Sequence, residues 1–129
     1  MARHAVQLSF LTLCSMMVCS SLILAKEKIT FTPKDKDRHE SKAASCEIQI
    51  FQDAKPVRAF TEIGVLNYHD EAHRAKDGAL KLDVALPKMK ASACKAGADA
   101  LIDIRVTEVR RLEFAMFNVR AVAVRFDSK

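Results

Sequence analysis

LPKMKASACKAGADALIDIRV, residues 86–106, decides the fold, because its apolar pattern changes from a helical to a strand spacing at one glycine. Before the glycine, apolar residues recur three or four positions apart and mark one face of a helix: Leu82, Leu86, Met89, Ala93 and Ala96. After it, apolar and polar residues alternate, which predicts a strand with one apolar face: Ile102, Ile104 and Val106. We therefore expect a helix that begins near Pro87 and ends at Gly97.

The link between this helix and the strand is the short sequence Gly97-Ala98-Asp99-Ala100. Gly97 lacks a Cβ, so it adopts the left-handed conformation of a helix cap without steric cost. Asp99 is suited to accept backbone N–H groups within the turn. A structural role is therefore predicted for both residues.

Runs typical of strands lie on both sides of this passage, at residues 46–51, 60–68, 101–109 and 117–126. In the first run, Cys46, Ile48 and Ile50 share one face, and in the second Gly64 marks a bulge or a close approach. A turn around residues 113–116 joins the last two. The order ββαββ predicts an α+β domain over residues 46–129, with a mainly antiparallel sheet and one helix packed on one face.

The amino-terminal end has the features of a secretory signal peptide. Arg3 precedes a long apolar run without acidic residues, and Ala25 supplies a small residue before the charged Lys26. We expect residues 1–25 to be removed, which places the protein in the periplasm or outside the cell. The apolar run is also long enough to span a bilayer, so an uncleaved membrane anchor is the alternative.

Residues 26–45 differ in composition from the domain that follows. They are rich in charge and contain only one short apolar patch, Ile29-Thr30-Phe31. Such a segment buries too little apolar surface to offset the entropy lost on ordering. We expect a mobile polar spacer between the cleavage site and the domain.

The sequence contains four cysteines, of which Cys14 and Cys19 would leave with the signal peptide. Cys46 and Cys94 remain in an oxidising compartment, where disulfides form and persist. Cys46 lies on the inferred core face of a strand and Cys94 on the flank of the helix stripe, so the two are expected to form a disulfide. Two separate buried thiols are the alternative.

Three segments, residues 48–51, 56–66 and 86–106, resemble the outer-membrane stress-sensor lipoprotein of the Rcs phosphorelay and similar small exported domains. The helix, the Gly-Ala-Asp-Ala turn and the strand also resemble a family named for heavy-metal binding. The first resemblance implies an envelope protein partner and a sensing role, and the second implies an exported metal-binding domain. The sequence departs from the Rcs sensor, which is a lipoprotein with two disulfides, because no cysteine here follows a suitable lipidation site.

A second line of evidence for metal binding is the segment His69-Asp70-Glu71-Ala72-His73. His69 and His73 lie four positions apart and would share a face if the segment were helical. Asn67, Asp77 and Gly78 instead favour a solvated polar connection over residues 69–78. A metal is therefore the one cofactor that the sequence leaves open, and no other is expected.

The charge balance gives a formal net charge of +5 for the whole chain. Residues 1–25 hold one basic and no acidic residue, so the remainder carries 20 − 16 = +4. This modest excess is compatible with contact with an anionic membrane or cell-wall surface, whereas the compartment argues against nucleic acid. Five arginines in the last two strands form either a basic stripe or a solvated sheet face: Arg105, Arg110, Arg111, Arg120 and Arg125.

Catalysis has little support in the sequence. No serine or cysteine has a recognisable histidine partner, and no glycine-rich phosphate loop occurs. We therefore expect a non-enzymatic envelope protein that binds or senses another envelope component, with the exported metal-binding domain as the alternative. The sequence leaves the oligomeric state open.

Overall fold

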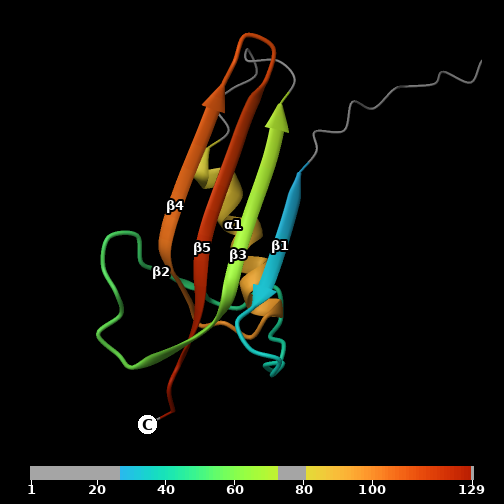
Figure 1. Ribbon diagram of the computed structural model, residues 1–129. Helices are drawn as coiled ribbons and strands as arrows, with labels where there is room; N and C mark the ends of the chain where they lie inside the picture. Colours follow the sequence, from blue (N-terminus) through green and yellow to red (C-terminus); the bar gives the residue numbers. More distant parts are fainter. Residues whose placement is uncertain (1–26, 73–80, 129) are drawn as a thin grey trace, which may run out of the picture.

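The computed structural model describes residues 27–72 and 81–128 (Figure 1). They form one sheet, one helix and the connections between them. The elements in chain order are β1 (Lys28–Pro33), β2 (Gln49–Ile50), β3 (Phe60–Ala72), α1 (Leu82–Lys95), β4 (Ala100–Arg110) and β5 (Ala115–Phe126). The five strands have the order β1-β3-β5-β4-β2, and every pairing except β2–β4 is antiparallel. The predicted α+β class, with one helix on one face of the sheet, is confirmed.

Helix α1 begins earlier than its proline suggested. The expected start near Pro87 is wrong, because α1 begins at Leu82 and Pro87 lies inside it. The added first turn brings Ala85, which is fully buried, and Leu82 against the sheet. Burial of these side chains offsets the backbone hydrogen bond that a proline within the helix cannot make.

The end of α1 agrees with the prediction. Gly97 has φ +81, and the N–H groups of Gly97 and Ala98 donate to the carbonyl oxygens of Cys94 and Ala93, each at 3.0 Å. These two bonds satisfy helix carbonyls as in a Schellman cap. A Cβ on Gly97 would also lie 2.6 Å from the carbonyl oxygen of Glu40. Glycine is therefore required here both by conformation and by space.

The predicted spacer is partly wrong, since residues 28–33 form the edge strand β1. This strand pairs antiparallel with β3 and packs Ile29 and Phe31 against the core. Gly64 makes the approach possible, because a Cβ there would lie 2.5 Å from Phe31 Cζ. The sheet register also shifts between Glu62 and Gly64, so this glycine marks both a bulge and a close approach. Pairing with β3 supplies the burial that the isolated patch lacks.

The first predicted strand is reduced to the two residues of β2. Gln49 and Phe51 donate N–H groups to the carbonyl oxygens of Asp99 and Leu101, at 3.1 and 2.9 Å. Beyond this point the edge of β4 changes direction, because Asp103 has φ +49 and the register with β5 shifts between Ile102 and Arg105. Such a bulge ends regular pairing at a sheet edge.

The same bulge overturns the expected strand face of Ile102, Ile104 and Val106. Ile102 packs with Val122 and Val124 on the face opposite the helix, which we call the outer face, whereas Ile104 packs against the helix-side core. One extra residue in β4 reverses the alternation, so residues that are two apart in sequence lie on opposite faces.

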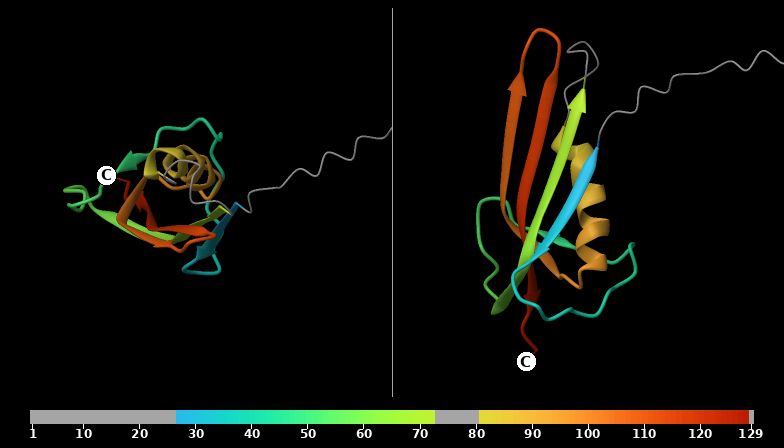
Figure 2. Two further views of the ribbon diagram at one scale, coloured as in Figure 1. Left: turned by 90° about the horizontal axis from the view of Figure 1, so that it is seen from above. Right: turned by 45° about the vertical axis from the view of Figure 1, so that its right-hand side comes forward.

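Two apolar clusters stabilise the sheet. The larger lies between the sheet and α1 and includes Leu66, Tyr68, Met89, Leu101 and Val119. The smaller lies on the outer face at the lower end of the sheet, where Phe51, Phe60 and Phe126 pack against Ala100, Ile102, Val122 and Val124. Figure 2 shows α1 on one face and the connection between β2 and β3 looping out at the lower end. Among the described residues, no helix or loop covers the upper part of the outer face.

The signal-peptide and membrane-anchor predictions concern residues outside the described part of the chain. Within residues 27–72 and 81–128, no helix has the length and apolar character needed to cross a membrane.

Candidate functional site

The disulfide predicted between Cys46 and Cys94 is present. Their Cα atoms lie 5.8 Å apart, and Cys94 is fully buried on α1. The N–H of Lys42 donates to the carbonyl oxygen of Cys94 at 2.9 Å, so two links hold the segment before β2 against the helix. A disulfide of this kind is typical of proteins from oxidising compartments.

Asp99 has the predicted structural role, although its donors come from other parts of the chain. The N–H of Phe126 donates to Asp99 Oδ2 at 2.8 Å, and Lys42 forms an ion pair with Asp99 Oδ1. Burial alone would raise the pKa of Asp99, but these two bonds and the charges of Lys42 and Arg125 lower it. The carboxylate therefore joins the helix cap to the end of β5 and to the segment before β2.

The histidine cluster is not arranged as predicted. His69 belongs to β3, as do the residues up to Ala72, so the segment is neither a helix nor a solvated connection up to that point. His73 lies outside the described residues. His69 Nε2 lies 2.8 Å from Glu71 Oε1, and His69 Nδ1 contacts Asn118 Oδ1. Both ring nitrogens therefore face oxygen acceptors.

This environment favours the charged imidazolium. The bonds to Asn118 and Glu71 raise the pKa of His69, against the opposing effect of burial. A metal ligand needs a neutral ring with a free lone pair, which is the form that these contacts disfavour. Within the described residues, no group of three or more His, Cys, Asp or Glu side chains could hold a metal ion.

The raised pKa of His69 predicts a pH-dependent contribution to stability. The pKa in the folded protein lies above the unfolded value of 6.5. The contribution is therefore present below that value and is lost as the pH rises through the folded pKa. We expect the difference in unfolding free energy between wild type and His69→Gln to be larger at about pH 6 than at about pH 9. Urea titrations at both pH values test this, and an equal difference would contradict it.

Asp70 is buried on the helix side of the sheet, a position that the sequence did not predict. It is 8% exposed, and its Oδ2 accepts a hydrogen bond from the Tyr68 hydroxyl at 3.2 Å. Oδ1 has no hydrogen-bond partner among the described residues. Burial raises the pKa of Tyr68 most, and the charge of Asp70 raises it further. The hydroxyl therefore stays protonated and acts as a donor. The alternation of Leu66, Tyr68 and Asp70 was the signal for this face.

The five arginines do not form a continuous basic stripe, since Arg111 lies beyond the end of β4 and only two of the others are neighbours on the outer face. Arg105 of β4 and Arg120 of β5 are direct cross-strand neighbours, and both are exposed. Neither forms a hydrogen bond or an ion pair within the described residues, whereas Arg110 pairs with Glu108 near the tip of the β4–β5 hairpin. Arg125 lies at the opposite end of the sheet. Two unpaired guanidinium groups therefore occupy neighbouring positions in the middle of the outer face.

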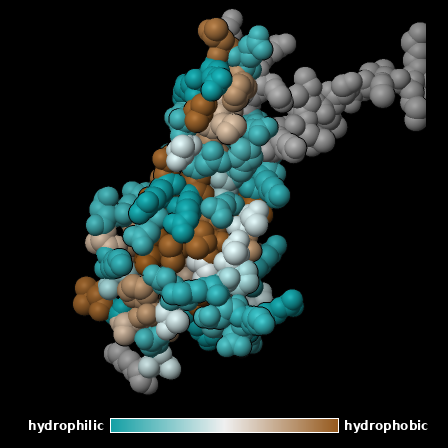
Figure 3. All heavy atoms as spheres, viewed as in Figure 1, coloured by the Kyte–Doolittle hydropathy of each residue, from teal (hydrophilic) through white to brown (hydrophobic). Residues whose placement is uncertain are grey.

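Polar side chains from all four long strands continue the surface around this pair. The register places two rows across the outer face, Thr30, Asn67, Arg120 and Arg105 in one and Lys28, His69, Asn118 and Thr107 in the next. Below Arg120 lies a depression of about 270 Å³ whose lining includes Gly64, Val65 and Val122. Figure 3 shows this face, with hydrophobic colours near its middle and hydrophilic side chains around them. The outer face therefore presents polar side chains with hydrogen-bond donors around a small depression.

The comparisons with known proteins support the fold. No family model matches the chain, and no curated protein matches it. Among solved structures, the chain is similar to the crystal structure of the Francisella virulence factor FvfA, with a TM-score of 0.53 and 14% sequence identity. The match covers 74% of this chain and 97% of that chain. At this identity the similarity shows a shared fold alone.

Proposed function

We propose that this chain is a non-enzymatic, exported envelope domain that binds an acidic surface of an envelope protein partner through the outer face of its sheet. The observation that carries the proposal is the adjacent, unpaired pair Arg105 and Arg120. Export is supported by the signal-like residues 1–25 and by the disulfide between Cys46 and Cys94. The resemblance to the Rcs stress sensor supports a sensing role for this binding.

The energetics of the arginine pair favour an anionic partner. Like charges directly opposite each other on neighbouring strands destabilise a sheet, and no carboxylate of the described residues neutralises this pair. A carboxylate from a partner would remove the repulsion and accept bidentate bonds from either guanidinium. Asn67, Asn118 and Thr107 surround the pair with further hydrogen-bonding groups. Arginine is also enriched in the cores of protein interfaces.

The exported metal-binding alternative has no comparable support. Both ring nitrogens of His69 face oxygen atoms of Asn118 and Glu71, and its pKa is raised. An incoming cation would have to displace these bonds and a proton before it reached the ring.

Photo-crosslinking in the host cell tests the proposed face. A photoreactive residue at Thr107 should give a discrete protein adduct, whereas one at Asp83 on the exposed side of α1 should not. The double variant Arg105→Gln/Arg120→Gln should lose at least about nine-tenths of the Thr107 adduct, consistent with loss of charged interface contacts. The double variant Arg38→Gln/Arg111→Gln changes the net charge equally at other positions and should retain it.

Two results would overturn the proposal. Absence of a protein adduct from Thr107 would do so, as would an adduct that is insensitive to the arginine replacements. If the protein instead sediments with anionic vesicles or isolated cell wall, and only when Arg105 and Arg120 are intact, the partner is the envelope surface rather than a protein.

A further inference from the structure

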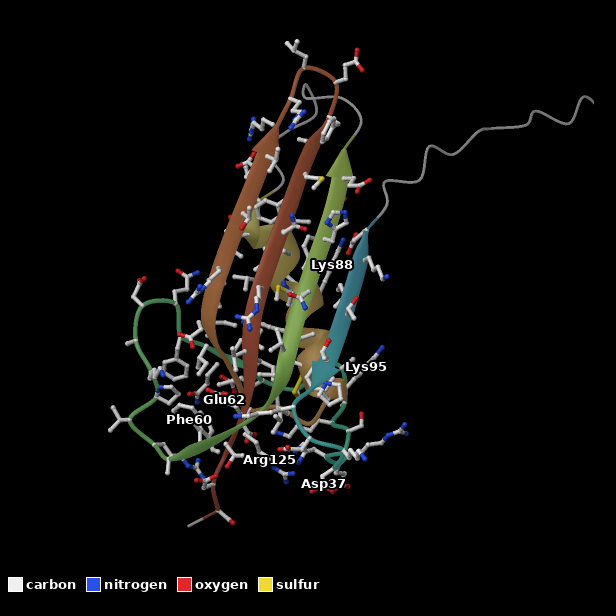
Figure 4. All side chains as sticks on the ribbon, in the orientation of Figure 1. Asp37, Phe60, Glu62, Lys88, Lys95 and Arg125 are labelled. Atoms are coloured by element: carbon white, nitrogen blue, oxygen red, sulfur yellow. A yellow bond between two sulfur atoms is a disulfide. The ribbon has the colours of Figure 1, made fainter. Side chains whose placement is uncertain are left out.

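Two cavities share a wall at the lower end of the molecule. The first, of about 540 Å³, lies between residues 31–41 and the end of α1, and the second, of about 480 Å³, lies where β3 begins and β5 ends. His39 and Ile63 line both. Figure 4 shows Asp37 and Lys95, which line the first cavity, and Arg125 at the end of β5, which lines the second. Each volume falls in the range of about 300–1,000 Å³ that is typical of small-molecule sites.

The first cavity has apolar walls and a charged rim. Phe31, Pro33, Ile63 and Ala96 contribute apolar surface from β1, from β3 and from the residue that follows α1. The charged members of the same lining are exposed and of both signs: Asp35, Lys36, Asp37, Arg38 and Lys95. An apolar chain would therefore find a surface that excludes water on several sides while its end remained open to solvent.

The second cavity is polar and has an excess of positive charge. Lys42 and Asp99 neutralise each other as an ion pair. Arg125 Nη1 lies 3.4 Å from His39 Nδ1, and Arg58 Nη2 donates to the backbone oxygen of Asp127 at 3.1 Å. Neither guanidinium forms an ion pair with a carboxylate of the described residues. Two arginines therefore face one remaining acid of the lining, Asp127.

The position of His39 connects the two environments. Its ring contacts Arg125 in the second cavity, while its Cβ lies against Gly97, the residue after Ala96 of the first. An apolar compartment thus adjoins a cationic one across a single side chain, and Ile63 forms part of the floor of both. A ligand with an apolar chain and an anionic head matches this order.

We propose that this pair of cavities binds a single-chain amphiphile with an anionic head group, with its chain beside Phe31 and Ala96 and its head at Arg125 and Arg58. The site is separate from the outer-face pair Arg105 and Arg120, which lines neither cavity. It therefore adds a small-molecule site to a domain whose proposed partner is a protein.

Titration calorimetry with octanoate, decanoate and laurate, below their micelle concentrations, tests the apolar compartment. Each buried methylene should tighten binding about fourfold, so laurate should bind at least about tenfold more tightly than decanoate. Dodecyltrimethylammonium has an alkyl chain about one methylene longer and the opposite charge, and it should still bind at least about tenfold more weakly than laurate. Dodecyl phosphate should bind if the site accepts anionic heads in general, whereas no binding of it restricts the head to a carboxylate.

Variants assign the two compartments. Arg125→Gln should weaken laurate binding about threefold to tenfold, and Arg105→Gln on the outer face should leave it unchanged. Ala96→Leu should fill the apolar cavity and remove most of the chain-length dependence. If Ala96→Leu does not fold, Ser41→Leu, at an exposed position of the same lining, replaces it.

Three results would overturn this proposal and leave the outer-face proposal intact. They are equal affinity for octanoate and laurate, equal affinity for the anionic and cationic dodecyl compounds, and equal loss of laurate binding in Arg125→Gln and Arg105→Gln. Loss of the Thr107 adduct in Arg105→Gln/Arg120→Gln, with laurate binding unchanged, would support both sites independently.

Discussion

Replacing Cys94 with alanine should lower the free energy of unfolding by about 4 kcal/mol, because the disulfide closes a loop with a sequence separation of 48 residues. This value comes from the conformational entropy that the cross-link removes from the unfolded chain. The residues between the two cysteines include β3 and most of α1, so the link restricts much of the domain. Urea denaturation of the oxidised wild type and of the variant gives the difference directly.

Reduction of the wild type provides the matched control. Dithiothreitol should lower the stability of the wild type by a similar amount and have little effect on Cys94→Ala. Cys94→Ser should be less stable still, since the position is fully buried and a hydroxyl there would need a hydrogen-bond partner. A wild-type midpoint that does not change on reduction would contradict the prediction. Free Cys46 in the variants should also form mixed disulfides in an oxidising medium.

The part of the fold that the sequence predicts well is governed by local chemistry. The helix stripe and the stop at Gly97 depend on neighbours within a few residues, and the structure contains both, followed by a strand as expected. Two cysteines permitted a single bridge, so its pairing also followed once export was assumed. These features needed no knowledge of how distant strands align.

The errors arise where long-range pairing decides the outcome. Residues 28–33 bury too little to be ordered alone, and they become a strand because Phe31 fits over Gly64 of β3. The bulge at Asp103 moves Ile104 to the face opposite Ile102. The local sequence around His69 favours a helix or a loop, whereas the register of β3 with β5 places this residue beside Asn118. No local spacing in the sequence indicates how β3 and β5 align.

The candidate sites also combine residues that local sequence identifies with contacts that only long-range pairing creates. The sequence assigned five arginines to the last two strands, but only the bulge in β4 brings Arg105 opposite Arg120. The cavities at the lower end depend on segments far apart in the chain, since His39 precedes the domain as it was predicted and Arg125 lies near its end. Residue types suggested an anionic partner, and the topology determined which residues meet.

Gly97→Val should lower the free energy of unfolding by about 3 kcal/mol or more, because two independent costs act at this position. The backbone has φ +81, a conformation that a β-branched residue strongly disfavours. The new Cβ would also lie 2.6 Å from the carbonyl oxygen of Glu40 and 2.9 Å from His39 Cβ, so the segment before β2 would have to move. Thermal and urea denaturation measure the loss.

Ala96→Val is the matched control, since it introduces the same side chain one residue earlier at an ordinary φ of −79. It should cost less than about 1 kcal/mol. An equal loss in both variants would show that valine is merely unfavourable near the helix end, and an unchanged midpoint for Gly97→Val would place the helix stop elsewhere. Because Gly97 contacts His39, the side chain between the two cavities, Gly97→Val should also weaken laurate binding in the molecules that remain folded. The absence of a side chain at Gly97 thus ends the helix and also leaves the space in which His39 lies between the two cavities.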